Sequence, residues 1–171
     1  LQTYPKHKYA LVRGQGSYVE DEKGKRYLDL YGGHAVSCLG HCHPRWVEAI
    51  SRQAATLDFY SNVCYHPLRA EAAERIVRHS YPSMVGAYFA NSGAEANETA
   101  VKMVRYLHSV QGKKDRVKII SRQMAYHGLA AATMTITGLP QFWQHFGPPT
   151  PYVVHIPAPY CYRCAFGKTV E

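Results

Sequence analysis

The chain has 171 residues, 46% of them apolar, and its 20 Lys and Arg against 12 Asp and Glu give a net charge of +8 at pH 7. This length and apolar content allow one hydrophobic core and exclude an intrinsically disordered chain. No apolar run approaches the roughly 20 residues that span a bilayer, and residues 1–10 lack the apolar core of a signal peptide, so we expect a cytoplasmic protein without a membrane partner.

The first third of the sequence is predicted to be rich in β structure. Residues 16–30 predict two short strands around a turn at residues 22–24, because strand-forming side chains flank that turn. These side chains are Tyr18, Val19, Tyr27, Leu28 and Leu30. A glycine-rich loop over residues 32–40 follows. Two helices then begin at Pro44 and Pro67, each with apolar residues three or four positions apart along one face.

From residue 81 onward, strands and helices are predicted to alternate. The expected order is a strand over 86–90, a helix over 94–110, a strand over 117–120, a short helix between His127 and Thr135, and a strand over 152–156. Strand, helix and strand at this spacing predict an α/β fold with a mainly parallel sheet. Three strands are too few to cover the edges of such a sheet, so we expect further chain to complete it.

Cysteine usage indicates reduced thiols, because the number is odd and no secretory signal is present. The five are Cys38, Cys42, Cys64, Cys161 and Cys164. Cys161 and Cys164 have C-x-x-C spacing, which zinc sites and redox pairs share. A structural zinc needs four ligands, and the other candidates, residues 41–43, lie far earlier in the chain. We therefore expect ordinary loop cysteines and no metal site.

Much of the positive charge lies between residues 102 and 122, where seven basic residues face only Asp115. They are Lys102, Arg105, Lys113, Lys114, Arg116, Lys118 and Arg122. We interpret the stretch as a solvated face. A missing acidic part of the protein is the next explanation, and nucleic-acid binding is the last, because no nucleic-acid motif accompanies the charge.

The stretch Ser92-Gly93-Ala94 stands where a predicted strand gives way to a predicted helix. The first amides of that helix lack intrahelical acceptors and attract an anion, Gly93 lets a ligand approach the backbone, and the Ser92 hydroxyl adds a donor. Ser92 and Glu95 also form the pattern of a capping box, which satisfies those amides without a ligand. Local physics leaves a phosphate site and a plain helix cap as equal alternatives.

Four ordered motifs between Gly14 and Gly167 resemble the class III, or omega, pyridoxal-phosphate aminotransferases. They are "YLDLYGGHAVSCLGHCHP", "NSGAEANETAVKMVR", "AYHG" and "PYCYRCAFG". The resemblance implies a fold-type I transferase dependent on pyridoxal 5'-phosphate (PLP). Residues 1–65 would form the N-terminal arm and part of the small domain. Residues 66–171 would form the first part of the large PLP-binding α/β domain, so we expect a portion of a longer chain.

The same resemblance assigns site residues. The expected cofactor-binding residues are Ser92, Gly93 and Ala94 at the phosphate, Tyr126 against the pyridine ring, and His127 as support for that loop. The expected substrate-pocket residues are Gly33, Phe59 and Tyr60. Core packing remains an alternative for the three aromatic residues, and a tight turn remains one for Gly33.

Catalysis in this family also needs a Schiff-base lysine and a carboxylate beside the pyridine nitrogen. None of the lysines here stands in the family's lysine motif, and Lys168 lies in the C-terminal tail. The chain is therefore expected to be inactive alone, as part of a homodimeric enzyme that moves an amino group from an amine or ω-amino acid to a 2-oxo acid. The alternatives are a racemase or aminomutase of the same fold, and a non-catalytic module that binds phosphate compounds or polyanions.

Overall fold

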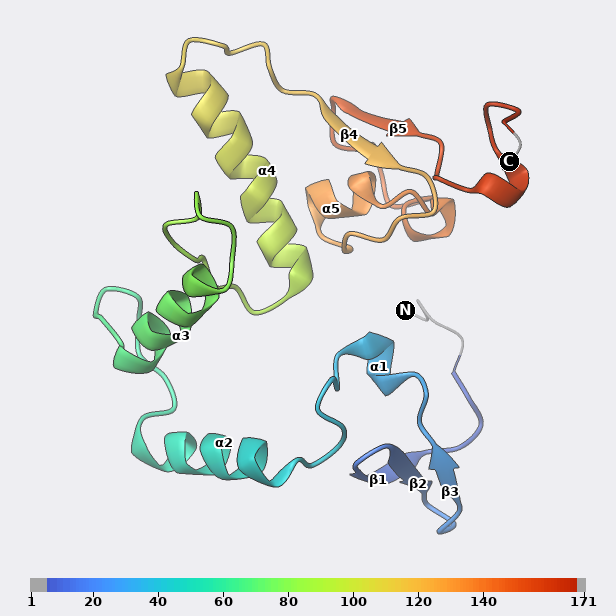
Figure 1. The fold of residues 1–171 in the computed structure, drawn as a ribbon. Helices are drawn as coiled ribbons and strands as arrows, with labels where there is room; N and C mark the ends of the chain where they lie inside the picture. Colours follow the sequence, from blue (N-terminus) through green and yellow to red (C-terminus); the bar gives the residue numbers. More distant parts are fainter. Residues whose placement is uncertain (1–5, 169–171) are drawn as a thin grey trace. The chain divides into compact units, whose positions relative to one another are not determined.

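The computed structural model describes residues 6–168. The chain divides into two compact units, Leu1–Pro67 and Leu68–Glu171 (Figure 1). Assignment of these parts to the small and large domains of an aminotransferase stays a prediction. No helix within residues 6–168 combines the length and the apolar character needed to cross a membrane.

The first unit contains a three-stranded antiparallel sheet in the order β1-β2-β3 (Figure 1). Its strands are β1 (Leu11–Gln15), β2 (Tyr18–Asp21) and β3 (Arg26–Leu28). The predicted hairpin is confirmed, with Val19 opposite Tyr27. Strand β1 was not predicted, since its polar and glycine residues show no apolar alternation. It exists because β2 supplies a hydrogen-bonding partner.

The turn of the hairpin is built around the carboxylate of Asp21, which is buried at 4% exposure. Asp21 Oδ1 accepts the backbone N–H groups of Lys23 and Lys25, both at 2.9 Å, and Oδ2 accepts the Tyr27 hydroxyl at 2.7 Å. The Tyr27 hydrogen bond, with help from the two amides, lowers the pKa of Asp21 against the opposing effect of burial. The same bond to Asp21 raises the pKa of Tyr27 to about 12.

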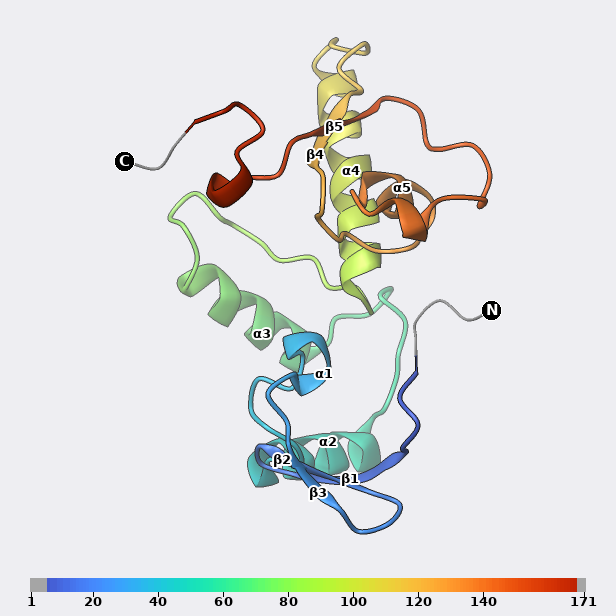
Figure 2. The same cartoon turned by 90° about the vertical axis from the view of Figure 1, so that its right-hand side faces the viewer.

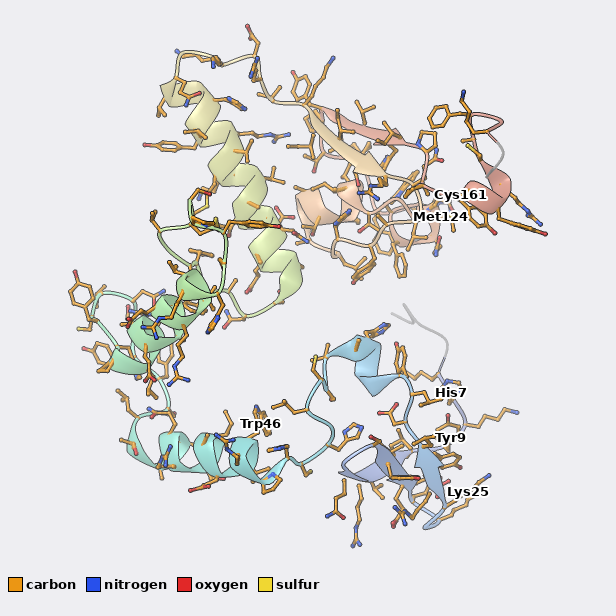
Figure 3. All side chains as sticks on the ribbon, viewed as in Figure 1. His7, Tyr9, Lys25, Trp46, Met124 and Cys161 are labelled. Carbon is orange, nitrogen blue, oxygen red and sulfur yellow. The ribbon has the colours of Figure 1, made fainter. Side chains whose placement is uncertain are left out.

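Aromatic stacking extends this turn toward the N-terminus. The rings of His7 and Tyr9 stack with centroids 5.2 Å apart, and Tyr9 stacks on Tyr27 at 5.3 Å. The Lys25 ammonium lies 5.0 Å from the centroid of Tyr27, and Figure 3 shows His7, Tyr9 and Lys25 gathered beside the sheet. Tyr27 is therefore held by a hydrogen bond, a ring stack and a cation at once.

The glycine-rich segment after β3 is not the plain loop that the sequence predicted. Residues Gly32–Ala35 (α1) form one left-handed turn, with φ of 56°, 58°, 61° and 61° along the four residues. The two glycines adopt this conformation without a Cβ clash, whereas His34 and Ala35 adopt it at a steric cost. Asp29 Oδ1 stabilises the entry to the turn by accepting the N–H groups of Tyr31 and Gly32 at 2.9 and 2.8 Å.

The two ends of this segment are held together by Asp29 and His41. Asp29 Oδ2 accepts a 2.7 Å hydrogen bond from His41 Nε2, and this bond is the main cause of the lowered pKa of Asp29. The backbone of His41 also pairs with Gly16 through two hydrogen bonds of 2.8 and 2.9 Å. A Cβ at Gly14 would lie 2.8 Å from His41 Cβ, so the histidine fits only against glycine.

Both predicted proline-initiated helices are present, as α2 (Pro44–Thr56) and α3 (Pro67–Arg78). The apolar stripe of α2 remains exposed within the part of the chain that the structure describes. Trp46 is 55% exposed and Ile50 is 53% exposed, and Figure 3 shows Trp46 projecting from the helix.

The second unit contains a parallel pair of strands with two helices beside it. The elements after α3 are α4 (Gly93–Val110), β4 (Ile119–Arg122), α5 (Ala131–Ile136), the 3₁₀ helix η1 (Pro140–Phe142), β5 (Val153–Ile156) and the 3₁₀ helix η2 (Cys161–Arg163). The strands β4 and β5 pair in parallel, Ile119 opposite Val153 through Arg122 opposite Ile156. The predicted α/β character and parallel pairing are confirmed, with β4 starting two residues later than expected.

The predicted strand over residues 86–90 is wrong in this structure, which has no strand there. A β-strand requires a hydrogen-bonding neighbour, and this segment pairs with no strand among residues 6–168. Its aromatic residues Tyr88 and Phe89 are 62% and 42% exposed. Within the described residues, the sheet of the second unit therefore has two strands rather than the three that the sequence predicts.

The core of the second unit forms around α5, which contacts α4 and both strands (Figure 2). Its buried apolar residues are Ala132 and Ile136, and threonines fill much of the remaining space. Thr133 and Thr137 are fully buried, and each hydroxyl has a hydrogen-bond partner. Burial of these hydroxyls is tolerated because none is left unpaired.

We predict that Tyr27 ionises near pH 12 rather than near pH 10. Because the pKa of the folded state lies above that of the unfolded chain, the stabilisation is full below pH 10 and is lost as the pH rises through about 12. The lowered pKa of Asp21 acts at the acid end, where stabilisation is lost as the pH falls below its usual 3.8.

A tyrosinate absorbance titration of the parent protein and the Tyr27→Phe variant isolates this group by difference. The difference curve should have its midpoint near pH 12. A midpoint near pH 10 would contradict the hydrogen bond to Asp21.

Candidate functional site

The N-terminus of α4 is capped by its own side chains. Ser92 has the extended φ and ψ of an N-cap, −150° and 160°, and its Oγ accepts the Glu95 N–H at 3.2 Å. Glu95 Oε2 accepts the Asn91 N–H at 2.7 Å, one residue before the position that a standard capping box uses. The capping alternative raised by the sequence is thus present in the structure.

The cap leaves an anion-binding arrangement intact. The N–H groups of Gly93 and Ala94 have no acceptor among residues 6–168. The Ser92 hydroxyl uses a lone pair in the cap, so its hydrogen is available to donate. A Cβ added to Gly93 would meet nothing within 4 Å, so a ligand can approach the backbone here. Cap and phosphate cradle are compatible, and the residues present fit a phosphate group.

The segment 125–128 lies directly against this end of α4. A Cβ at Gly128 would lie 2.6 Å from the Ala94 Cβ and 2.9 Å from its Cα. Gly128 has a φ of +125°, which side-chain-bearing residues rarely adopt. One turn further along α4, Asn97 Nδ2 donates to the His127 carbonyl at 2.9 Å. The structure therefore brings together the predicted phosphate residue Ala94 and the predicted ring-side loop.

Thr137 holds the same segment from within the core. Its Oγ1 accepts the His127 N–H at 3.0 Å and donates to the Gly128 carbonyl, also at 3.0 Å. Since Thr137 is fully buried, both hydrogen bonds are shielded from water. His127 contributes through both of its backbone polar groups, and its supporting role at a cofactor stays a prediction.

The second glutamate of the motif, Glu98, caps a different helix from Glu95. Glu98 Oε1 accepts the N–H groups of Ala132 and Thr133, at 2.7 and 2.8 Å, in the first turn of α5. A carboxylate at a helix N-terminus satisfies otherwise unpaired amides and complements the helix dipole. Glu98 thereby joins α4 to α5.

Sequence reasoning missed Asn97, Glu98 and Thr137 as parts of this site. A signal for two of them existed, because Ala94, Asn97 and Glu98 follow the i, i+3, i+4 spacing that places residues on one helical face. Polar side chains on the helical face that packs through Ala94 indicate that the neighbouring segment has backbone groups in need of hydrogen-bond partners. For Thr137 the sequence carried no comparable signal.

Tyr126 is not a buried core residue, since it is 52% exposed. Its ring contacts Phe142 edge to face, with centroids 5.6 Å apart and an interplanar angle of 71°. The alternative that Tyr126 serves only to pack the core is therefore disfavoured. An exposed aromatic ring is suited to stacking on a planar ligand.

The predicted substrate-pocket residues all belong to the first unit. Gly33 lies within the left-handed turn α1, and Phe59 and Tyr60 lie in the segment after α2 at 78% and 59% exposure. Their pocket stays a prediction.

Cys161 and Cys164 lie at η2, the first exposed and the second half-buried. Both are free thiols. Within residues 6–168, no group of three or more His, Cys, Asp or Glu side chains is placed to hold a metal ion.

The class of protein follows from comparison with known structures and families. Solved structures that superpose on the chain are transaminases, and with them it shares the fold of the fold-type I PLP-dependent transferases. The chain belongs to the class III aminotransferase family, whose family model matches residues 2–169.

Named relatives agree with this membership. The chain is 42% identical over 158 residues to the acetylornithine aminotransferase of Synechocystis sp., covering 92% of this chain and 36% of that protein. It is 37% identical over 157 residues to the acetylornithine/succinyldiaminopimelate aminotransferase of Yersinia pestis, covering 92% and 38%. The chain thus spans little more than a third of these curated relatives.

Two solved structures give the same result. The omega transaminase from Pseudomonas jessenii, in complex with PMP, superposes with a TM-score of 0.88 at 34% identity, over 97% of this chain and 40% of that one. An (S)-enantioselective omega-transaminase from Thermomicrobium roseum superposes with a TM-score of 0.87 at 39% identity, over 95% and 37%.

We predict that Gly128→Ala lowers the free energy of unfolding by about 1–3 kcal/mol, because the new methyl group would overlap Ala94. Gly112→Ala is the matched control, since Gly112 also has a positive φ, +77°, but nothing lies within 4 Å of an added Cβ. The free energy of unfolding of that control should fall by only about 1 kcal/mol, because alanine is strained at a positive φ. Urea unfolding measures both, and equal losses would contradict close packing at Gly128.

Proposed function

We propose that the full-length protein is a PLP-dependent aminotransferase that moves an amino group from an amine or ω-amino acid to a 2-oxo acid. The observation that carries the proposal is the packing of Gly128 on Ala94, which brings the loop that contains Tyr126 against the end of α4 where two amides are unpaired. Family membership supports it, as do the names of the relatives, acetylornithine aminotransferases and omega transaminases.

In the proposed site the chain binds the cofactor at two places. The N–H groups of Gly93 and Ala94 and the Ser92 hydroxyl hold the phosphate, and the Tyr126 ring lies against the face of the pyridine ring. Stacking there fixes the ring plane and excludes water from one side. When bound, PLP supplies the electron sink that makes exchange of the amino group possible.

Glu95 sets a limit on the strength of phosphate binding. Its carboxylate lies at the same helix terminus, bonded to the Asn91 N–H, and repels a second anion. Because a helix dipole contributes only about 0.3–1 kcal/mol, the direct hydrogen bonds must provide most of the affinity. The proposal therefore requires Ser92, Gly93 and Ala94 to act together.

The donor is proposed to carry its amino group on the end of an alkyl chain, as the names of the relatives imply. Gly33, Phe59 and Tyr60 are proposed to border its pocket.

A homodimeric assembly and a cytoplasmic location stay predictions. We expect residues 1–171 to be inactive alone, since none of their lysines stands in the family's Schiff-base motif. A racemase or aminomutase reaction would use the same cradle, and a substrate screen separates these activities.

We predict that Ser92→Asp weakens PLP binding by the full-length protein more than about tenfold, equivalent to 1.4 kcal/mol. Aspartate is as good an N-cap as serine, so the helix is retained while a negative charge enters the cradle. Tyr126→Ala should also weaken binding, because the stacking surface is lost. The dissociation constant for PLP, measured from the absorbance or fluorescence of bound cofactor, reports both effects.

Glu95→Gln is the matched control for charge. Glutamine can still accept the Asn91 N–H but carries no charge, so PLP affinity should rise about two- to fivefold. If Ser92→Asp and Tyr126→Ala bind PLP as tightly as the parent, the assigned site is wrong. Salt-sensitive binding of phosphate compounds without preference for PLP would instead support the non-catalytic module.

A further inference from the structure

We infer that Asn97 is a positioning residue that sets the place of Tyr126 relative to the phosphate cradle, acting through the carbonyl of His127. This inference rests on the proposed function and extends it to a side chain one helical turn beyond Ala94 on α4. The amide Nδ2 of Asn97 donates to the His127 carbonyl at 2.9 Å, across 30 residues of sequence.

The cradle and Asn97 belong to the same rigid element, α4. Gly128 packs on Ala94 at the first turn, and His127 is bonded to Asn97 at the next. Two consecutive residues of the loop are thus attached to two positions on one face of the helix. Tyr126 precedes this attached pair by a single residue, so little backbone freedom separates its ring from the cradle.

A second side chain, from the core of the unit, also holds His127. Thr137 accepts the His127 N–H, while Asn97 donates to the His127 carbonyl. Both polar backbone groups of His127 are therefore held by side chains from different elements. Loss of the Thr137 bond would free the peptide plane between Tyr126 and His127, and loss of the Asn97 bond would free the next plane, between His127 and Gly128.

Asn97 is not replaceable by its neighbour. Glu98 Oε1 is already engaged with two amides of α5, and a carboxylate has no hydrogen to donate to a carbonyl. The two adjacent residues have different partners. Glu98 accepts hydrogen bonds from α5, and Asn97 donates one to the loop that contains Tyr126. An alanine or serine at position 97 would not reach the His127 carbonyl.

A double-mutant cycle in the full-length protein tests the inference. Asn97→Ala should weaken PLP binding about five- to thirtyfold, the range expected for loss of one part-buried hydrogen bond. In a Tyr126→Ala background the same change should have little further effect, because Asn97 acts through that ring. Asn97→Ser provides a second, smaller change with the same expectation if the alanine variant folds poorly.

A spectroscopic readout and a stability control accompany the cycle. Ring orientation is followed by the circular dichroism induced in the absorption band of bound PLP, which Asn97→Ala should alter. The control is Ser121→Ala, which removes a buried 2.6 Å hydrogen bond to the Ile136 carbonyl without touching residues 125–128. It should lower thermal stability and leave PLP affinity within about twofold of the parent.

Three outcomes decide the matter. Non-additive loss of affinity with an altered dichroism signal supports the inference. Additive losses at Asn97 and Tyr126, or equal effects of Asn97→Ala and Ser121→Ala, overturn it, because Asn97 would then be only structural. Failure of the parent protein to bind PLP overturns the proposed function itself, and the inference with it, and is distinguished because no variant is needed to observe it.

Discussion

The contact between Gly128 and Ala94 is the constraint on which the second unit depends. The Ala94 Cβ lies 2.6 Å from the position that a Cβ of residue 128 would take, too close for any side chain there, so the loop approaches α4 in a way that requires glycine. This approach brings His127 within reach of Asn97 and α5 within reach of Glu98. One missing side chain thus allows a helix, a loop and a second helix to share a single polar contact region.

Hydrogen bonding, rather than apolar burial, specifies much of this region. The buried residues around α5 include Thr133, Thr135 and Thr137 beside only two buried apolar residues. A buried hydroxyl without a partner would be destabilising, so each must find a particular carbonyl or amide. This requirement fixes the backbone of residues 127–128 more narrowly than packing alone, which is valuable where a cofactor ring must be placed.

The first unit uses the same principle with carboxylates. Asp21 organises the hairpin turn by accepting two amides and the Tyr27 hydroxyl, and Asp29 joins both ends of the following segment by binding His41 and the amides of the left-handed turn. In each case one side chain replaces several backbone partners that a turn cannot provide. The strained residues His34 and Ala35 are retained because these surrounding bonds hold the segment in place.

The sequence by itself determined the features that depend on near neighbours: the helices begun by Pro44 and Pro67, the hairpin around residues 22–24, the cap at Ser92 and the family motifs. Only the tertiary structure decided whether residues 86–90 pair as a strand, that Gly32–Ala35 turn left-handed, and that Asn97, Glu98 and Thr137 belong to the candidate site. Caps and helical stripes are satisfied within a few residues, so their patterns are local. A strand needs a partner, and the bonds of Asn97 and Glu98 cross 30 and 34 residues, so a local pattern can place these side chains on one helical face but cannot specify their partners.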